Sequence, residues 1–517
     1  MRESSKKTAK SPSSRAAKST PEARSPKSRA AKSATGTTQA LKASTPTKAA
    51  SKATPKSAPK ASSKVSATVS TKPVAKATAK PSAKSGAAAT SRAKAPRTTA
   101  ASQATSTRSA SSKTSARMTT APTAGTRKSS AGATTAASKG RTILCVTRVK
   151  AGRAFMEEAA RLGCRVLVLT EDAALKDRFP DCVGRIVTVH SLQDWNAVAS
   201  MVSRLYREEP IDRVVPMLEA QVELAARIRQ LLGIPGQTPE QARLFRDKLA
   251  MRLTALGAGI PVPYFAPALD RERLTGLLES VAPPYMLKLR DGLGSQNVQR
   301  IDSRAQLMPA IISKGPRIDD YLVEQYIAGD VYHVDSVVEG GKVQFSLASR
   351  YGLPLYDVLQ GGNFVTYTVA RGSQLEAQLL KLNAKVIKAF GLQRGVTHIE
   401  FIRSAETGEL YFLEAANRIP SARIPMVVNE ASGVCLYHEL AKLEAHDKYQ
   451  APKPKDGHAG FITTVPKRGP VKLDTFKEKE IVWRSPDPYQ PGLIIRSEDP
   501  KRVEKLLKDY DKRFATF

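Results

Sequence analysis

Two glutamates in apolar strands are the residues of this sequence that point most directly to chemistry. Residues 396–402 alternate between two faces in the manner of a strand, and residues 410–414 form a second apolar run after a polar, glycine-containing turn. Glu400 lies inside the first strand and Glu414 at the end of the second. Because a carboxylate among apolar residues is costly unless it is paired or bound to a cation, this hairpin is a candidate Mg²⁺ site. Two strand-end glutamates that face solvent would leave the same pattern.

A lysine and a glycine-rich loop earlier in the chain predict a site for phosphate groups. Lys288 is embedded in an apolar run of strand length, residues 285–289, and the loop 291–298 follows it with Gly294 and Ser295. The backbone N–H groups of such a loop can hold phosphate oxygens, and a nearby lysine supplies a point charge to the same phosphates. An ordinary hairpin turn is the competing interpretation.

Two further strands, at 321–327 and 331–338, lie between this loop and the glutamate hairpin. The second contains His333, and His398 shares a strand face with Glu400 because side chains two positions apart point the same way. A histidine in a strand is more often a structural residue than a ligand, so the roles of both histidines stay open.

Taken together, these segments resemble the ATP-grasp superfamily of carboxylate–amine ligases over about residues 141–450. No single motif is strict, but several occur in the order and rough spacing of that family. The resemblance implies that Lys248 and Lys288 contact the nucleotide phosphates and that Gly294 and Ser295 belong to a flexible phosphate loop. It also implies that adenine is read by a hinge made of Glu324, Gln325, Tyr326 and Ile327. Asp330 would accept a ribose hydroxyl, and Glu400 and Glu414 would be Mg²⁺ ligands.

The end of the glutamate hairpin departs from the family pattern. ATP-grasp enzymes often have E-x-N-x-R, whereas this chain has Glu414-Ala415-Ala416-Asn417-Arg418. Arg418 keeps its place, but Asn417 is shifted by one position. Asn417 is therefore the least secure of the implied metal ligands.

The chemistry that the resemblance implies needs no nucleophilic side chain. A substrate carboxylate attacks the γ-phosphate of ATP, ADP leaves, and an amine or another nucleophile, such as a thiol, then displaces phosphate from the acyl phosphate. Mg²⁺, or Mn²⁺ as an alternative, together with Lys288 and Arg418 would neutralise the charge that moves in the first step. Arg350, in a segment expected to be a substrate loop, and Arg418 are the candidates for contact with the small carboxylate and amine substrates.

The expected fold combines α/β and α+β parts in an ATP-grasp arrangement. Strand–helix alternation with apolar strands predicts a parallel α/β pre-domain at 141–236. A two-lobed ATP clamp at 237–450 and a small C-terminal lobe at 451–517 complete the prediction. A homodimer is one option for its assembly.

The N-terminal 140 residues differ sharply in composition from the rest of the chain. They hold 29 lysines and arginines against 2 acidic residues and contain no Phe, Trp or Tyr, so residues 141–517 carry only +8 of the total net charge of +35. Such a segment cannot bury enough apolar surface to offset its ordering entropy, and it is expected to be disordered. Its S/T-P-x-K/R units resemble those of linker-histone tails. Non-specific DNA or RNA contact through phosphates, a plain spacer, and a transit peptide are the alternatives for its role.

Other features bear on where the protein acts. No apolar run reaches the roughly 18–20 residues of a membrane span, and Cys145, Cys164, Cys182 and Cys435 lack the spacing of a metal site. A cytoplasmic protein is therefore expected, with nucleoid or nuclear association through the basic segment as a variant. The alternative function is a nucleic-acid-associated protein whose ATP-grasp body only binds nucleotide.

Overall fold

The computed structural model of the 517-residue chain describes residues 140–149, 151–171, 179–467 and 469–517. The expectations of disorder and of nucleic-acid contact concern residues 1–140 and lie, except at Gly140, outside the described residues. Among the described residues, no helix combines the length and the apolar character needed to cross a membrane.

The first folded segment is a four-stranded parallel sheet in the order β3-β2-β1-β4. Its interior strands are almost wholly buried because helices pack on the sheet, which explains their continuous apolar sequence. The parallel sheet predicted from strand–helix alternation is confirmed. The elements are β1 (Thr142–Val146), α1 (Arg153–Arg161), β2 (Arg165–Thr170), β3 (Val183–Thr188), α2 (Trp195–Glu208), β4 (Arg213–Pro216), η2 (Glu219–Gln221) and α3 (Val222–Leu232).

The helical segment that follows the parallel sheet consists of two helices. It forms α4 (Pro239–Arg243) and α5 (Lys248–Gly257). The break arises because the Asp247 side chain caps α5 by accepting the Leu249 and Ala250 N–H groups. The cap places Lys248 in the first turn of α5.

A small antiparallel sheet carries the predicted phosphate loop and hinge. Its order is β5-β8-β6-β7, and its apolar face packs on α6 and α7. The elements are β5 (Phe265–Pro267), α6 (Arg271–Ser280), β6 (Tyr285–Leu289), β7 (Gln299–Ile301), α7 (Arg304–Ile312), η3 (Gly315–Asp320) and β8 (Tyr321–Gln325).

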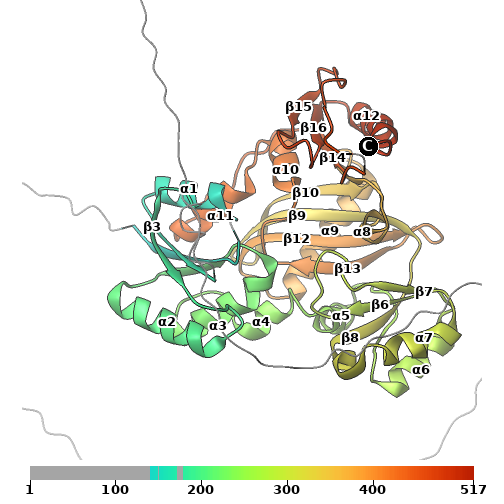
Figure 1. Cartoon of the computed structure of the whole chain (residues 1–517), viewed down its shortest axis with the longest axis horizontal. Coiled ribbons are helices and arrows are strands. Elements are labelled where there is room, and N and C mark those ends of the chain that lie inside the picture. Colours follow the sequence, from blue (N-terminus) through green and yellow to red (C-terminus); the bar gives the residue numbers. More distant parts are fainter. Residues whose placement is uncertain (1–139, 150, 172–178, 468) are drawn as a thin grey trace, which may run out of the picture. The chain divides into compact units, whose positions relative to one another are not determined.

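An eight-stranded antiparallel sheet has the order β13-β12-β9-β10-β11-β14-β16-β15. It lies above the small sheet in the view of Figure 1. One of its faces packs on α5 and α9 and the other on α10 and α11. The C-terminal strands extend this sheet and share a core with α12. The elements are β9 (Gly329–Glu339), β10 (Lys342–Tyr351), α8 (Leu355–Leu359), β11 (Phe364–Thr368), α9 (Gln374–Ala389), β12 (Arg394–Ser404), β13 (Leu410–Ala416), α10 (Ile424–Ser432), α11 (Leu436–Ala445), β14 (His458–Thr463), β15 (Ile481–Arg484), β16 (Gly492–Ser497) and α12 (Pro500–Phe514).

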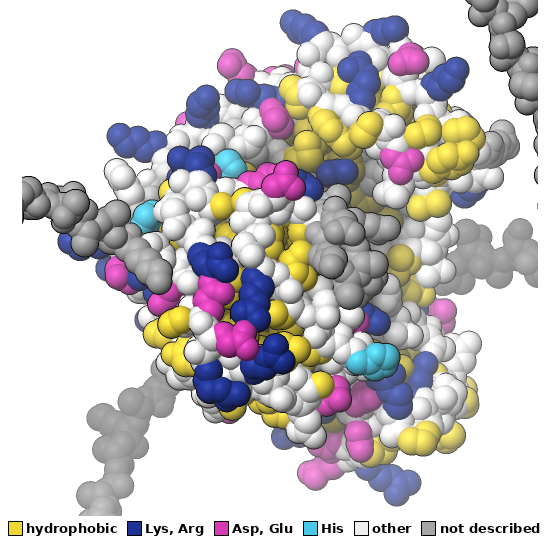
Figure 2. All heavy atoms as spheres, turned by 60° about the vertical axis from the view of Figure 1, so that its left-hand side comes forward, with side chains coloured by type: hydrophobic (Ala, Val, Ile, Leu, Met, Phe, Trp, Pro, Cys, Tyr) yellow, Lys and Arg dark blue, Asp and Glu magenta, His cyan; other side chains and the backbone are white. Residues whose placement is uncertain are grey.

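Charges of both signs are mixed on the molecular surface. On the face shown in Figure 2, Lys and Arg side chains lie beside Asp and Glu side chains. Glu208 on α2, for example, forms ion pairs with Arg204 of the same helix and with Arg185 of β3. This mixture fits the net charge of only +8 that residues 141–517 carry.

Candidate nucleotide and metal site

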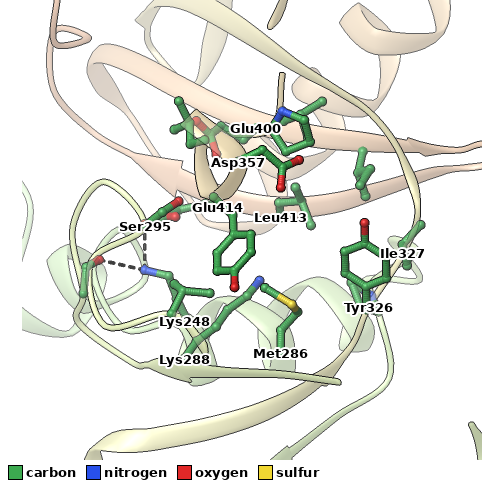
Figure 3. A pocket seen from close by; sticks show the side chains of 18 of the residues that line it. Lys248, Met286, Lys288, Ser295, Tyr326, Ile327, Asp357, Glu400, Leu413 and Glu414 are labelled. Carbon is green, nitrogen blue, oxygen red and sulfur yellow. Dashed lines mark hydrogen bonds and ion pairs between the residues drawn. The ribbon is translucent and has the colours of Figure 1, made fainter. Parts of the chain in front are cut away.

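Glu400 and Glu414 are direct cross-strand partners in the β12–β13 pair, with a bulge immediately after Glu400. The Glu400 side chain is 15 % exposed and that of Glu414 is 26 % exposed, and both line one cavity, here called the nucleotide pocket (Figure 3). Cross-strand neighbours lie close enough for their carboxylates to share one cation. Oxygen ligands of this type suit Mg²⁺, so the donor set fits the predicted metal.

Two lysines approach the same pocket from different elements. Lys248 Nζ, in the first turn of α5, donates to Glu414 Oε1 at 2.9 Å and to the Gly292 carbonyl at 2.8 Å. Lys288 reaches the pocket from β6, and its Nζ is 2.6 Å from Glu324 Oε2. The structure therefore brings together a carboxylate pair and two ammonium groups, which is the charge pattern needed to bind a metal–polyphosphate complex.

The predicted phosphate loop closes one side of the pocket. Gly294, Ser295 and Asn297 have φ values of 53°, 60° and 59°, a left-handed conformation that turns backbone groups in unusual directions. Ser295 lines both the nucleotide pocket and a neighbouring cavity, and Gly294 lines only the neighbouring cavity. The loop thus borders two spaces.

An apolar slot forms the other end of the nucleotide pocket, where Tyr326 and Ile327 lie with Met286 and Leu413 (Figure 3). Gln325 also lines this end. A flat aromatic base fits an apolar slot beside a hinge backbone. Gln325, Tyr326 and Ile327 therefore lie where the sequence predicted that adenine is read.

A second cavity of about 490 Å³, here called the acceptor cavity, adjoins the first and is lined by Tyr351, Phe364, Arg418 and others. The two cavities have in common Ser295, Gln296, Leu355, Glu400 and Glu414. A group in the acceptor cavity can therefore meet the phosphate end of a nucleotide beside the carboxylate pair.

Arg418 lines the acceptor cavity, and its guanidinium pairs with Glu219 of η2, in the segment that contains the parallel sheet. Its Nε and Nη2 donate to Glu219 Oε2 at 3.0 and 2.5 Å, and Arg246 Nη1 donates to Glu219 Oε1 at 2.8 Å. Burial would raise the pKa of Glu219, but the two guanidinium groups outweigh burial and hold that pKa below its usual value. Arg246 also donates to the Asp291 carbonyl, so Glu219 connects Arg418 to the start of the phosphate loop.

A buried polar network supports Glu400 from behind. Tyr351 Oη donates to Glu400 Oε1 at 3.0 Å and lies 3.2 Å from His398 Nε2. The Asp335 carboxylate lies 2.7 Å from His398 Nδ1 and 2.9 Å from His333 Nδ1. Burial would lower the pKa of His398, but Asp335 and Glu400 outweigh burial and raise it to about 9. Hydrogen bonds and the charge of His398 likewise lower the pKa of Glu400 against the effect of burial.

Four residues predicted for the site lie elsewhere. Glu324 is fully buried and forms ion pairs with Arg252 and Lys288, so it anchors a pocket lysine and does not itself line the pocket. Asn417 donates to Gln237 Oε1 at 2.6 Å and lines a separate cavity, so its geometry gives no support to metal ligation.

The remaining two, Asp330 and Arg350, pair with each other at 2.6 Å. Arg350 is the cross-strand partner of Tyr332, which packs against α9, and therefore it points away from the face that carries Tyr351. Val331, not Asp330, lines the nucleotide pocket. The structure thus places both Asp330, predicted to contact ribose, and Arg350, predicted to contact substrate, on the face of the sheet opposite Tyr351.

Sequence reasoning missed several residues around the site. Asp357, on the short helix α8, lines the nucleotide pocket on the side where Glu400 and Leu413 lie (Figure 3). Tyr351, which donates a hydrogen bond to Glu400, was not assigned a role. The alternation of His333 and Asp335 on β9, and of His398 and Glu400 on β12, was the available signal for the buried network. The signal could not be interpreted from the sequence, because the cross-strand register of β9 and β12 was not known.

Known proteins resemble this chain in both sequence and fold. Residues 156–236 match the family described as the ATP-grasp N-terminal domain. An L-arginine-specific L-amino acid ligase of Bacillus subtilis is 23% identical over 296 residues, which cover 56% of this chain and 71% of that protein.

The crystal structure of an L-amino acid ligase from Bacillus licheniformis superposes with a TM-score of 0.59 at 19% identity, over 72% of this chain and 98% of the other. The chain has the ATP-grasp fold. A second structure of this fold, the biotin carboxylase domain of a Hydrogenobacter thermophilus 2-oxoglutarate carboxylase in complex with MgADP, superposes with a TM-score of 0.55 at 16% identity, over 72% of this chain and 89% of the other. The predicted ATP-grasp fold is confirmed, and these similarities support ATP-dependent, ADP-forming ligation.

Proposed function

We propose that this protein is an ATP-grasp ligase that joins a carboxylate to an amine, with Mg²⁺, and that amino acids are among its substrates. The observation that carries the proposal is the convergence of Glu400, Glu414, Lys248 and Lys288 on one pocket with an apolar slot. The similarity to amino acid ligases supports the substrate class.

The residues of the pocket suit the binding and orientation of ATP. The adenine enters the slot beside Tyr326 and Ile327, and Lys248, Lys288 and the Ser295 loop bind the phosphates. Glu400 and Glu414 would hold Mg²⁺, which would offset phosphate charge and supply Lewis acidity. Because both reactants are anionic, positioning and charge neutralisation provide most of the rate gain.

Arg418 orients the substrate carboxylate at the junction of the two cavities. A carboxylate oxygen attacks the γ-phosphorus, the bond to the β-phosphate oxygen breaks, and ADP leaves. The amine then attacks the acyl carbon, the bond between that carbon and the phosphate oxygen breaks, and inorganic phosphate leaves with the proton that the amine gives up. The pairing of Arg418 with Glu219 fixes the guanidinium before substrate binds, so less conformational entropy is lost on binding.

The decisive experiment measures ADP release in a pool of amino acids and small carboxylic acids, with products identified by mass spectrometry. Glu400→Gln and Glu414→Gln should each lower ADP release at least about 100-fold, as expected when charge stabilisation at the reacting phosphate is lost, while circular dichroism stays unchanged. Glu406→Gln, at an exposed position in the turn of the same hairpin, is the matched control and should retain full activity. Undiminished turnover in both pocket variants would refute the metal assignment.

Three domains and a cytoplasmic location are proposed with this function. The family match ends at residue 236, which supports a boundary between an α/β pre-domain at 141–236 and the clamp at 237–450. The separate core around α12 supports a C-terminal lobe at 451–517. All four cysteines are free thiols, which supports a reducing compartment.

A further inference from the structure

The lining of the acceptor cavity is mainly apolar and includes Leu293, Leu355, Val358, Leu359, Phe364 and Ile424. Its polar members include Glu400 and Glu414, which also line the nucleotide pocket, and Arg418, Glu219 and His398, which do not. A ligand that has both a carboxylate and an apolar body matches this lining.

Helix α8 supplies one apolar wall. Leu355, Val358 and Leu359 all line the cavity, and Leu359 is 55 % exposed. Phe364, which follows α8 at the start of β11, packs edge-on against Tyr351 with ring centroids 5.8 Å apart. The exposed apolar side chain of Leu359 would be covered by a ligand in the cavity.

The acidic groups of the cavity are already engaged within the protein. Glu219 pairs with Arg418 and Arg246. Glu400 accepts from Tyr351, and Glu414 accepts from Lys248. Among the described residues that line the cavity, each carboxylate therefore has a partner, and a cationic substrate side chain would have to displace one of them.

We propose that the acceptor cavity binds the side chain of the carboxylic acid that is activated, and that this side chain is apolar, of about the size of Leu, Met or Phe. This inference rests on the proposed ligase function and narrows its substrate class. It also separates this chain from the arginine-specific relative, because a guanidinium would meet apolar walls here.

The first test varies only the carboxylic acid. With Mg-ATP and hydroxylamine as a common nucleophile, kcat/KM for hydroxamate formation is measured for leucine, methionine and phenylalanine and for arginine, lysine and glutamate. Burial of the apolar side chain should favour the first group by roughly 10- to 100-fold. Equal or higher kcat/KM for arginine or glutamate would overturn the inference and leave the ligase function standing.

Binding provides a second readout that does not need turnover. Calorimetry with a non-hydrolysable ATP analogue and Mg²⁺ should show leucine binding at least about 10-fold tighter than arginine. If leucine binds in this way but no acid is turned over, the ligase function fails and the apolar site stands. If leucine neither binds nor reacts better than arginine, the inference is wrong.

A matched pair of variants tests the α8 wall. Val358→Asp should reduce the leucine-over-arginine ratio at least about 10-fold in both assays, because it places an unpartnered carboxylate in the wall. Val358→Leu, which keeps the wall apolar, should preserve the order of preference. The same ratio in Val358→Asp as in the unaltered protein would show that this wall does not contact the substrate, and would overturn the assignment of the cavity.

Discussion

Replacement of Arg252 by methionine removes one of the two cations that face the buried carboxylate of Glu324. Both side chains are fully buried, with Arg252 Nε 2.7 Å from Glu324 Oε1 and Lys288 Nζ 2.6 Å from Glu324 Oε2. The Arg252 guanidinium also lies over the Phe412 ring at 5.6 Å. Methionine can retain part of the packing volume and none of the charge, so the variant isolates the loss of the ion pair.

The expected loss of stability in Arg252→Met, and its dependence on pH, follow from the pKa of Glu324. Burial raises the pKa of Glu324, but Arg252 and Lys288 outweigh burial and lower it to about 2. The difference from the usual 4.5 corresponds to about 3 kcal/mol, in the same range as the ~3–5 kcal/mol lost when one partner of a buried ion pair is removed. A lowered folded-state pKa means that this stability is fully present above about pH 4.5 and is lost as the pH falls toward 2.

The free energy of unfolding of the full chain, measured by urea denaturation between pH 3 and pH 7, tests both statements. Arg252→Met should lose about 3–5 kcal/mol at pH 7, and its difference from the unaltered protein should narrow as Glu324 becomes protonated. Arg204→Met, which breaks the exposed pair with Glu208 on α2, is the control and should leave the free energy of unfolding almost unchanged, because water screens exposed ion pairs. Equal losses in the two variants, or a difference that does not change with pH, would refute an ionised Glu324 held by two cations.

Two further substitutions test where the structure places predicted site residues. Arg350→Ala should change the KM of ATP and of the carboxylic acid by less than about twofold, because Arg350 pairs with Asp330 away from the pocket. The free energy of unfolding should fall by about 1 kcal/mol or less. A rise confined to the KM of the carboxylic acid would contradict that orientation. Asp357→Asn should raise the KM of ATP about 10-fold if the carboxylate accepts a ribose hydroxyl, and it should have little effect on the KM of dideoxy-ATP, which lacks both ribose hydroxyls. An equal rise for both nucleotides would assign Asp357 another role.

Strand positions were predictable where burial dictates the sequence. The bounds of β6 agree with the apolar run predicted at 285–289, because Tyr285, Leu287 and Leu289 pack in one core with α6 and α7. Strand β10 was not predicted: its polar end at 349–351 looked like a loop, and only pairing with β9 and β11 makes it a strand.

The position of a residue along a strand proved easier to predict than the face on which it lies. Asp330 and Val331 are neighbours, and a shift of one residue exchanges the pocket face for the opposite face. Nothing in the local sequence distinguished the two, since Asp330 was a plausible acceptor and Val331 a plausible core residue. The contacts of β9 with β12 and β10 decided it.

The amino-acid sequence by itself determined the chemistry that the protein can carry: Glu400 and Glu414 on adjacent strands, Lys288 before a glycine-rich loop, and an arginine after the hairpin. These signals are local, because each depends on residue type and on spacing within one or two elements. Only the tertiary structure decided which groups meet. Lys248 reaches Glu414 across 166 positions of the chain and Glu219 holds Arg418 across 199, and such pairings arise from the packing of separate elements, which no local pattern encodes.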